Sequence, residues 1–160
     1  MKKDQGKKKR EKFIEPFVPL KAADIEKATK LICEFALETN EPYDKKHIRN
    51  LLTKYADGKL PILLAKNKAG DVLGISGFIC VPHLYNPNVM QAAEFIWYAS
   101  DKLSRFDRAS LMKRLLDIMI ATCQKQKISL YVNTPTYSYL NDMLVFEGFR
   151  PKTISYVKEF

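Results

Sequence analysis

The chain has 160 residues, enough for one domain with its own core, and its 46% hydrophobic and 28% charged residues are typical of globular proteins. It holds no apolar run of about 18 residues and no apolar segment after its basic N-terminus, so neither a membrane span nor secretion is expected. Three widely spaced cysteines and two isolated histidines favour a reducing, cytoplasmic setting and argue against disulfides or a metal site.

The formal net charge of +9 is concentrated at the N-terminus. Residues 1–12 hold seven Lys or Arg residues and two acidic residues, a net +5. We interpret this segment as a flexible basic arm that precedes a single domain over residues 13–160. Lys2–Lys12 are expected either to contact a polyanion or a particle, or to act only as a solubilising tail.

The first half of the domain is predicted to begin with a strand over Phe13–Pro19, followed by two helices. Asp24 precedes apolar residues at helical spacing, and this helix is expected to end near Glu38. Asp44 is a good N-cap for the second helix. Gly58 is expected to end that helix, because glycine readily takes the left-handed conformation found there.

A hairpin follows, with strands over Pro61–Asn67 and Val72–Val81 and a turn at Lys68–Asp71. A polar loop over Pro82–Asn88 is expected to lead to the next strand, Ala93–Ser100. Glycines inside the second hairpin strand indicate a bulge or close packing. The remaining predicted elements are a loop, a long helix that starts near Ala109, a strand, a helix and a final strand: Asp101–Arg108, Ser110–Gln126, Ile128–Val132, Thr136–Phe146 and Thr153–Phe160.

Antiparallel hairpins therefore come first, and strand–helix–strand connections follow. This order predicts an α/β fold in which a mixed central sheet is flanked by helices on both faces.

Three short segments give this order a more specific meaning: Val72–Gly77 (VLGISG), Glu94–Tyr98 (EFIWY) and Phe146–Phe149 (FEGF). With the element order, they resemble the GNAT (Gcn5-related N-acetyltransferase) family, and in particular small GNAT-like proteins of bacteriophages. The resemblance covers roughly residues 13–160 and implies a GNAT-like acyl-CoA N-acyltransferase fold.

The resemblance also implies a site for acetyl-CoA where the strand Glu94–Ser100 splays from Ile128–Asn133. Backbone groups there would pair with the pantetheine arm, and the pyrophosphate would meet the N-terminus of the long helix, which favours negative charge. The residues implied to contact the cofactor are Tyr98, Ala99, Ser100, Arg105, Arg108, Ala109, Ser110 and Asn133.

The family's phosphate loop usually reads Arg/Gln-x-x-Gly-x-Gly/Ala, and here it departs from that pattern. If Arg105 takes the first position, Arg108 and Ser110 replace the two glycines that allow close backbone approach. The arginines then either bind the pyrophosphate through their side chains or are solvated loop charges.

Glu94 matches a position at which some family members place a general base. Simple alternation puts Glu94 on the same strand face as Tyr98; the alternative is an edge carboxylate paired with a lysine. The family's usual catalytic tyrosine falls on Leu144 here, so Tyr137 and Tyr139 are candidates to replace it, or are packing aromatics.

Two functions follow from the resemblance. One is acetyl transfer from acetyl-CoA to an amine substrate, in a monomer or a homo-oligomer. The other is a non-catalytic role in phage assembly or in the virion, anchored by the basic arm. A third function, nucleic-acid binding, would depend on the arm alone.

Overall fold

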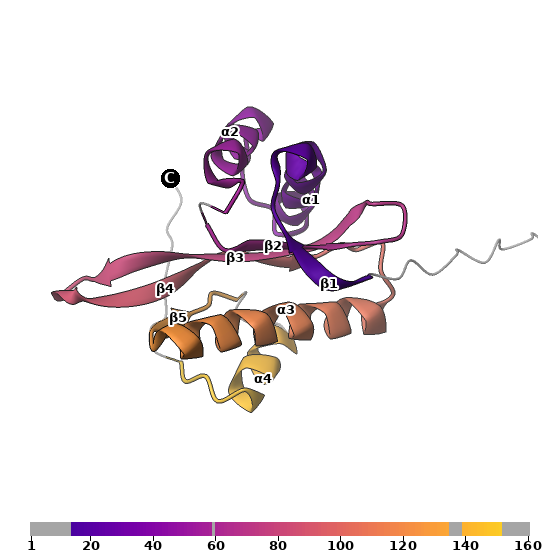
Figure 1. Cartoon of the computed structure of the whole chain (residues 1–160). Helices are drawn as coiled ribbons and strands as arrows, with labels where there is room; N and C mark the ends of the chain where they lie inside the picture. The colour runs from indigo at the N-terminus through magenta and orange to yellow at the C-terminus, as the bar shows by residue number, and fades with distance from the viewer. Residues whose placement is uncertain (1–13, 59, 135–138, 152–160) are drawn as a thin grey trace, which may run out of the picture.

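The computed structural model describes residues 14–58, 60–134 and 139–151. These residues form one five-stranded sheet, with α1 and α2 on one face and α3 and α4 on the other (Figure 1). In chain order the elements are β1 (Ile14–Pro19), α1 (Ile25–Glu38), α2 (Lys45–Tyr55), β2 (Ile62–Lys66), β3 (Val72–His83), β4 (Asn86–Ala99), α3 (Arg105–Gln126), β5 (Ser129–Tyr131) and α4 (Tyr139–Phe146).

The strands lie in the order β1-β2-β3-β4-β5. The first four pair antiparallel, and β5 joins β4 in parallel after the crossover through α3. The predicted α/β class with a mixed sheet between helices is therefore confirmed. Phe13, residues 136–138 and the predicted strand Thr153–Phe160 lie outside the described residues.

Each face of the sheet has its own hydrophobic core. On the α1/α2 side, Leu31 and Leu52 pack with Ile75 of β3. On the α3 side, Leu111 and Leu115 are fully buried. Gly74 of β3 lets α3 lie this close, because a Cβ atom there would be 2.8 Å from Cδ2 of Leu111.

The start of α2 agrees with the sequence prediction, whereas the helix ends earlier than predicted: Ala56 is extended, and Asp57 (φ 60°) is left-handed before Gly58. The carboxylate of Asp44 accepts hydrogen bonds from the backbone N–H groups of Lys46 (2.7 Å) and His47 (3.3 Å), which caps the helix. The helix ends at Tyr55, and Gly58 has a φ of 82°. None of the helices in the described part of the chain is long and apolar enough to cross a membrane.

The predicted loop over Pro82–Asn88 is wrong. β3 continues to His83 and β4 begins at Asn86, so only Leu84 and Tyr85 lie between the two strands. The hairpin extends well past the helices (Figure 1). Proline and asparagine at this end of the hairpin mark an irregular register near the tight turn, where His83 pairs with Asn86, and not a loop.

The start of α3 also differs from the prediction, because the helix begins at Arg105 and not near Ala109. The Oγ of Ser104 accepts a 3.1 Å hydrogen bond from the backbone N–H of Asp107, and its hydroxyl donates a 2.5 Å bond to the Asp107 carboxylate. This reciprocal capping stabilises a helical turn over residues that were expected to form a loop.

Candidate functional site

The open edge of β4 is the feature around which the site is built. β5 pairs with β4 only over Gln91–Ala93, so in the described chain no strand covers the β5-facing edge of Glu94–Ala99. The N–H of Ser100 donates to the carbonyl of Leu73 on the β3 side (2.8 Å). Because antiparallel pairing uses alternate residues, the backbone groups of Ala99 face the open edge. The expected splay of β4 from β5 is therefore present.

A β-bulge lies at the point where the two strands separate. Gly77 pairs with Ile96 and Phe78 with Glu94, which leaves Phe95 as an extra residue in β4. The bulge reverses the alternation of faces. Glu94 lies opposite Phe78, which packs on the α3 side, whereas Tyr98 packs on the α1/α2 side. The prediction that Glu94 and Tyr98 share a face is wrong for this reason.

The Glu94 side chain is half-buried, and one of its oxygens, Oε2, accepts a 2.9 Å hydrogen bond from the backbone N–H of Asn133. Burial raises the pKa of Glu94 to about 7, while the hydrogen bond from Asn133 opposes this rise. Among the described residues no lysine forms an ion pair with Glu94. A carboxylate with this pKa can take up and release a proton near neutral pH.

The N-terminus of α3 lies next to the end of β4, where Arg108 contacts Ala99. Some backbone N–H groups of its first turn already have hydrogen-bond partners within the protein. Ser104 holds the N–H of Asp107 through Oγ and the N–H of Arg108 through its carbonyl oxygen (2.8 Å). Ala109 and Ser110 lie in the second turn, where N–H groups bond to carbonyls within the helix. They are therefore not at the start of the helix, where the sequence prediction placed them, and the exposed Arg105 lies in the first helical turn.

Arg108 is not a solvated loop charge. Its Nε donates a 2.8 Å hydrogen bond to the carbonyl of Ala99, and its terminal nitrogen donates a 2.7 Å bond to Oε2 of Glu38. The guanidinium lies 5.1 Å from the ring centroid of Tyr98, and the Tyr98 hydroxyl donates to the same Glu38 oxygen (2.8 Å). Burial alone would raise the pKa of Glu38, but these two hydrogen bonds lower it below its usual value.

Ser100 joins the adjacent loop to α1. The buried Ser100 hydroxyl donates to Glu34 (3.1 Å), and the Lys102 ammonium donates to the other oxygen of the same carboxylate (3.1 Å). Two carboxylates on successive turns of α1, Glu34 and Glu38, thus fix the end of β4 and the start of α3. No local pattern predicts these contacts, because the bonded residues are 60 to 70 positions apart in the chain.

One of the two aromatic candidates lies at the start of α4. Tyr139 is its first residue and is exposed, whereas Tyr137 lies outside the described residues. Leu144 is buried in the α3-side core. Asn133 is exposed and contributes its backbone N–H to the site. The structure thus brings Glu94 and Asn133 together at the splay, and Tyr98, Ala99 and Arg108 together at its outer end.

A cavity of about 290 Å³ lies on the α1/α2 side of the bulge. The bulge turns both Phe95 and Ile96 toward this side of the sheet, and they line the cavity with Phe35 of α1. Glu41 and Asp44 add acidic groups from the α1–α2 connection. The remaining lining residues are Ile32, Ala36, Pro42, Tyr43, His47, Ile48 and Leu51. This cavity suits a molecule with an apolar part and a positive charge.

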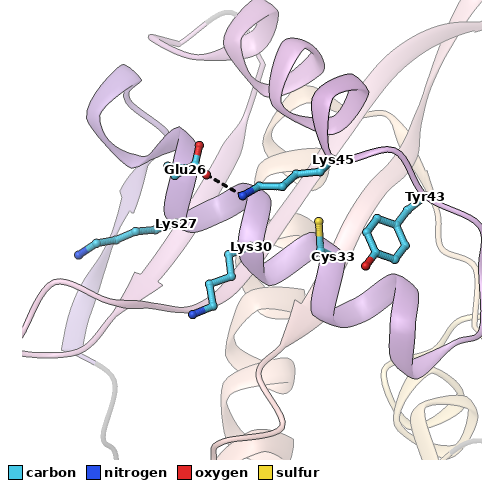
Figure 2. A pocket seen from close by; sticks show the side chains of 6 residues that line it. All are labelled: Glu26, Lys27, Lys30, Cys33, Tyr43 and Lys45. Carbon is cyan, nitrogen blue, oxygen red and sulfur yellow. Dashed lines mark ion pairs between the residues drawn. The ribbon is translucent and has the colours of Figure 1, made fainter.

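A second cavity, of about 350 Å³, lies on the outer side of α1 (Figure 2). Its charged groups are largely satisfied within the protein: Lys45 pairs with Glu26 at 2.9 Å, and Lys27 donates to the carbonyl of Gly70 at 2.7 Å. The other lining residues are Lys30, Cys33 and Tyr43. No group of three His, Cys, Asp or Glu side chains gathers as a metal site within the residues that the structure describes.

Comparison with known proteins gives a clear answer for the fold. No family model matches the sequence, and no curated protein does. Solved structures of acetyltransferases do match. A ribosomal-protein-alanine N-acetyltransferase from Brucella melitensis biovar Abortus 2308 is 17% identical with a TM-score of 0.66, and the match covers 91% of this chain and 100% of that one.

Two further matches each cover 91% of this chain and 95% of the other. A predicted acetyltransferase from Clostridium acetobutylicum, solved with acetyl-CoA, is 11% identical with a TM-score of 0.67. An aminoglycoside acetyltransferase from an uncultured soil metagenomic sample, in complex with sisomicin, is 12% identical with a TM-score of 0.62. The chain therefore has the fold of the GNAT acetyltransferases.

Proposed function

We propose that this protein is an N-acetyltransferase that moves an acetyl group from acetyl-CoA to an amine. The observation that carries the proposal is the position of Glu94, whose pKa of about 7 suits a general base, at the point where β4 separates from β5. An open strand edge can pair with an amide-containing chain, and an ionisable carboxylate beside it can accept a proton from a reacting amine.

In this proposal the pantetheine arm pairs with the open edge of β4 through the backbone of Ala99, whereas the backbone groups of Tyr98 and Ser100 face β3 by the same alternation. The pyrophosphate lies at the first turn of α3, where the helix dipole and the guanidinium groups of Arg105 and Arg108 favour negative charge. The second-turn position of Ala109 and Ser110 leaves the arginine side chains as the main anion ligands. The acetyl-CoA complex of the Clostridium acetobutylicum structure supports a cofactor of this kind.

The acceptor amine would enter the cavity between α1, α2 and the bulge of β4. Phe35, Phe95 and Ile96 offer an apolar surface, and Glu41 and Asp44 favour a cation. An amine that carries an apolar group fits this lining. Sisomicin in the soil-metagenome structure supports an amine acceptor for the fold.

Glu94 would remove a proton from the acceptor ammonium and so make its nitrogen nucleophilic. Glu94 lies on the α3 side of the sheet and the cavity on the other, so the proton would travel around the open edge of β4 through water. The nitrogen then attacks the thioester carbonyl and the N–C bond forms. As the C–S bond breaks, the nitrogen loses its second proton to water and becomes the amide N–H. The sulfur leaves as a thiolate that takes a proton, for which the exposed hydroxyl of Tyr139 is the described candidate.

The test combines binding with turnover. Acetyl-CoA at 100 times its Kd should stabilise the protein by about 2.7 kcal/mol, visible as a higher melting temperature. With a panel of apolar amines, release of the free thiol of coenzyme A should accompany acetylation, and Glu94→Gln should slow it by about 10²–10⁴-fold. Absence of any coenzyme A binding would contradict the proposal and leave the non-catalytic assembly role to be tested by co-purification with a particle.

A further inference from the structure

The side chain of Arg108 crosses the open edge of β4. It starts on α3, on one face of the sheet, and reaches Glu38 at the end of α1, on the opposite face (Figure 1). On its way its Nε binds the carbonyl of Ala99 (2.8 Å). By the alternation of β4, this carbonyl belongs to the open edge. The guanidinium therefore lies against the open edge of β4 at Ala99.

We infer that Glu38, Arg108 and Tyr98 form a latch across this open edge, and that Glu38 is the positioning residue that keeps the latch closed. When coenzyme A binds, its pyrophosphate takes the guanidinium of Arg108 from Glu38, and the carbonyl of Ala99 becomes free to pair with the pantetheine arm. This inference rests on the proposed function, since it assigns a closed and an open state to the same cofactor site.

The charges of the groups involved allow such an exchange. The Glu38 side chain is 44% exposed and that of Arg108 is 23% exposed, so their ion pair is partly screened by water and worth little on its own. Arg108 contacts Glu38 through one nitrogen, as the 2.7 Å bond shows, whereas a pyrophosphate carries more charge and can accept two parallel hydrogen bonds. The phosphate is therefore the better partner for Arg108.

Glu38 also has a second partner that can hold it when Arg108 leaves. The Tyr98 hydroxyl donates to the same Oε2 atom, and its pKa is raised, first by burial and then by this hydrogen bond. Tyr98 therefore stays protonated and keeps its bond to the Glu38 carboxylate. Opening the latch costs one partly solvated ion pair, the hydrogen bond to Ala99 and the contact of the guanidinium with the Tyr98 ring, and it leaves no buried charge without a partner.

The test is calorimetric titration of the full-length protein with coenzyme A. Glu38→Gln weakens the hold on Arg108, so it should tighten coenzyme A binding by about two- to fivefold, the range of a partly exposed ion pair. Arg108→Ala should weaken binding. In the Arg108→Ala background Glu38→Gln should no longer tighten it, because the coupling between the two residues is lost.

Glu147→Gln is the matched control. Glu147 follows α4 and pairs with Lys113 of α3 at 3.0 Å. The same loss of one negative charge should leave the affinity for coenzyme A within about 1.5-fold of the original, because the partner that it releases is Lys113 and not Arg108.

Four outcomes are informative. If Glu38→Gln binds coenzyme A more tightly than the unmodified protein and Glu147→Gln does not, the latch is supported. This holds even if the unmodified protein binds too weakly to measure. If the unmodified protein binds coenzyme A and Glu38→Gln binds equally or more weakly, the latch is wrong and the proposed function stands. Equal tightening in Glu147→Gln would assign the effect to net charge and overturn the latch. If no variant binds coenzyme A, both the latch and the proposed function fall.

Discussion

The carboxylate of Glu94 accepts a 2.9 Å hydrogen bond from the backbone N–H of Asn133, 39 positions later in the chain. This bond joins β4 to the segment after β5 at the place where the two strands separate. The bond stabilises the charged form of Glu94 and so lowers its pKa, but burial has the larger effect and raises the pKa to about 7. The ionisation of Glu94 therefore changes within the physiological pH range, and two predictions depend on it.

The first prediction concerns the pH dependence of acetyl transfer. A general base acts only when ionised, so kcat/KM should rise with pH, reach half its maximum at about 7 and then level off. In Glu94→Gln this rise of kcat/KM with pH should disappear, together with most of the activity. The measurement is initial rates of coenzyme A thiol release across that range. A profile that is flat around pH 7 with full activity at acidic pH would rule out Glu94 as the base.

The second prediction concerns stability and needs no substrate. The pKa of Glu94 is about 7 in the folded protein and close to the ordinary glutamate value of 4.5 when the chain is unfolded. Between pH 4.5 and about 7 the folded state binds more protons than the unfolded state, so Glu94 lowers the free energy of unfolding as the pH rises through this range. Above pH 7 the ionised, partly buried carboxylate destabilises the protein by up to about 3 kcal/mol.

Glu94→Gln removes this charge and retains an oxygen that can accept from Asn133. The variant should therefore be more stable than the original protein above pH 7, and the difference should disappear toward pH 4.5. Urea unfolding at several pH values measures it. A constant difference at all pH values would mean that Glu94 does not titrate in this window.

The sequence was sufficient for the order of the described elements, because hydrophobic periodicity and capping residues are local signals. Asp44 is a clear example, since its side chain caps α2 where its position before the helix predicted a cap. The start of α3 was also readable: Ser104 and Asp107 have the spacing of a reciprocal cap. The polar residues around them made this stretch resemble a loop.

Other parts of the site have no local signal. The bulge at Phe95 comes from the register between β3 and β4, and a single extra residue moves Glu94 to the other face of the sheet. The contact between Glu38 and Arg108 joins residues 70 positions apart on two helices that cover opposite faces. Only the packed structure shows that the arginine expected in a phosphate loop is held by a carboxylate of α1.

The third prediction tests where α3 begins. Ser104→Ala removes the oxygen that caps the N–H of Asp107 and should lower the free energy of unfolding by about 0.5–2 kcal/mol. Ser110→Ala is the matched control, because Ser110 lies inside the helix, where alanine is the better helix former. It should leave the stability unchanged or slightly raised. Thermal unfolding of both variants tests this. If Ser110→Ala destabilised the protein and Ser104→Ala did not, the helix would begin near Ala109 and not at Arg105.

The last prediction concerns the contact that holds α3 against the sheet. A Cβ atom at Gly74 would lie 2.8 Å from Cδ2 and 3.2 Å from Cγ of Leu111, and 3.2 Å from Cδ1 of Leu115. Gly74→Ala should therefore lower the free energy of unfolding by about 1–3 kcal/mol through overpacking. Leu111→Ala alone should cost about 2–5 kcal/mol, because the side chain is fully buried.

The double variant distinguishes this contact from a general intolerance of β3 to substitution. With Leu111 shortened, the new methyl group at position 74 has room, so the double variant should be more stable than the sum of the two single effects predicts. Urea unfolding of the four proteins gives the coupling energy. Strict additivity would mean that Gly74 is needed for a reason other than the close approach of Leu111, and that α3 does not rest on β3 at this point.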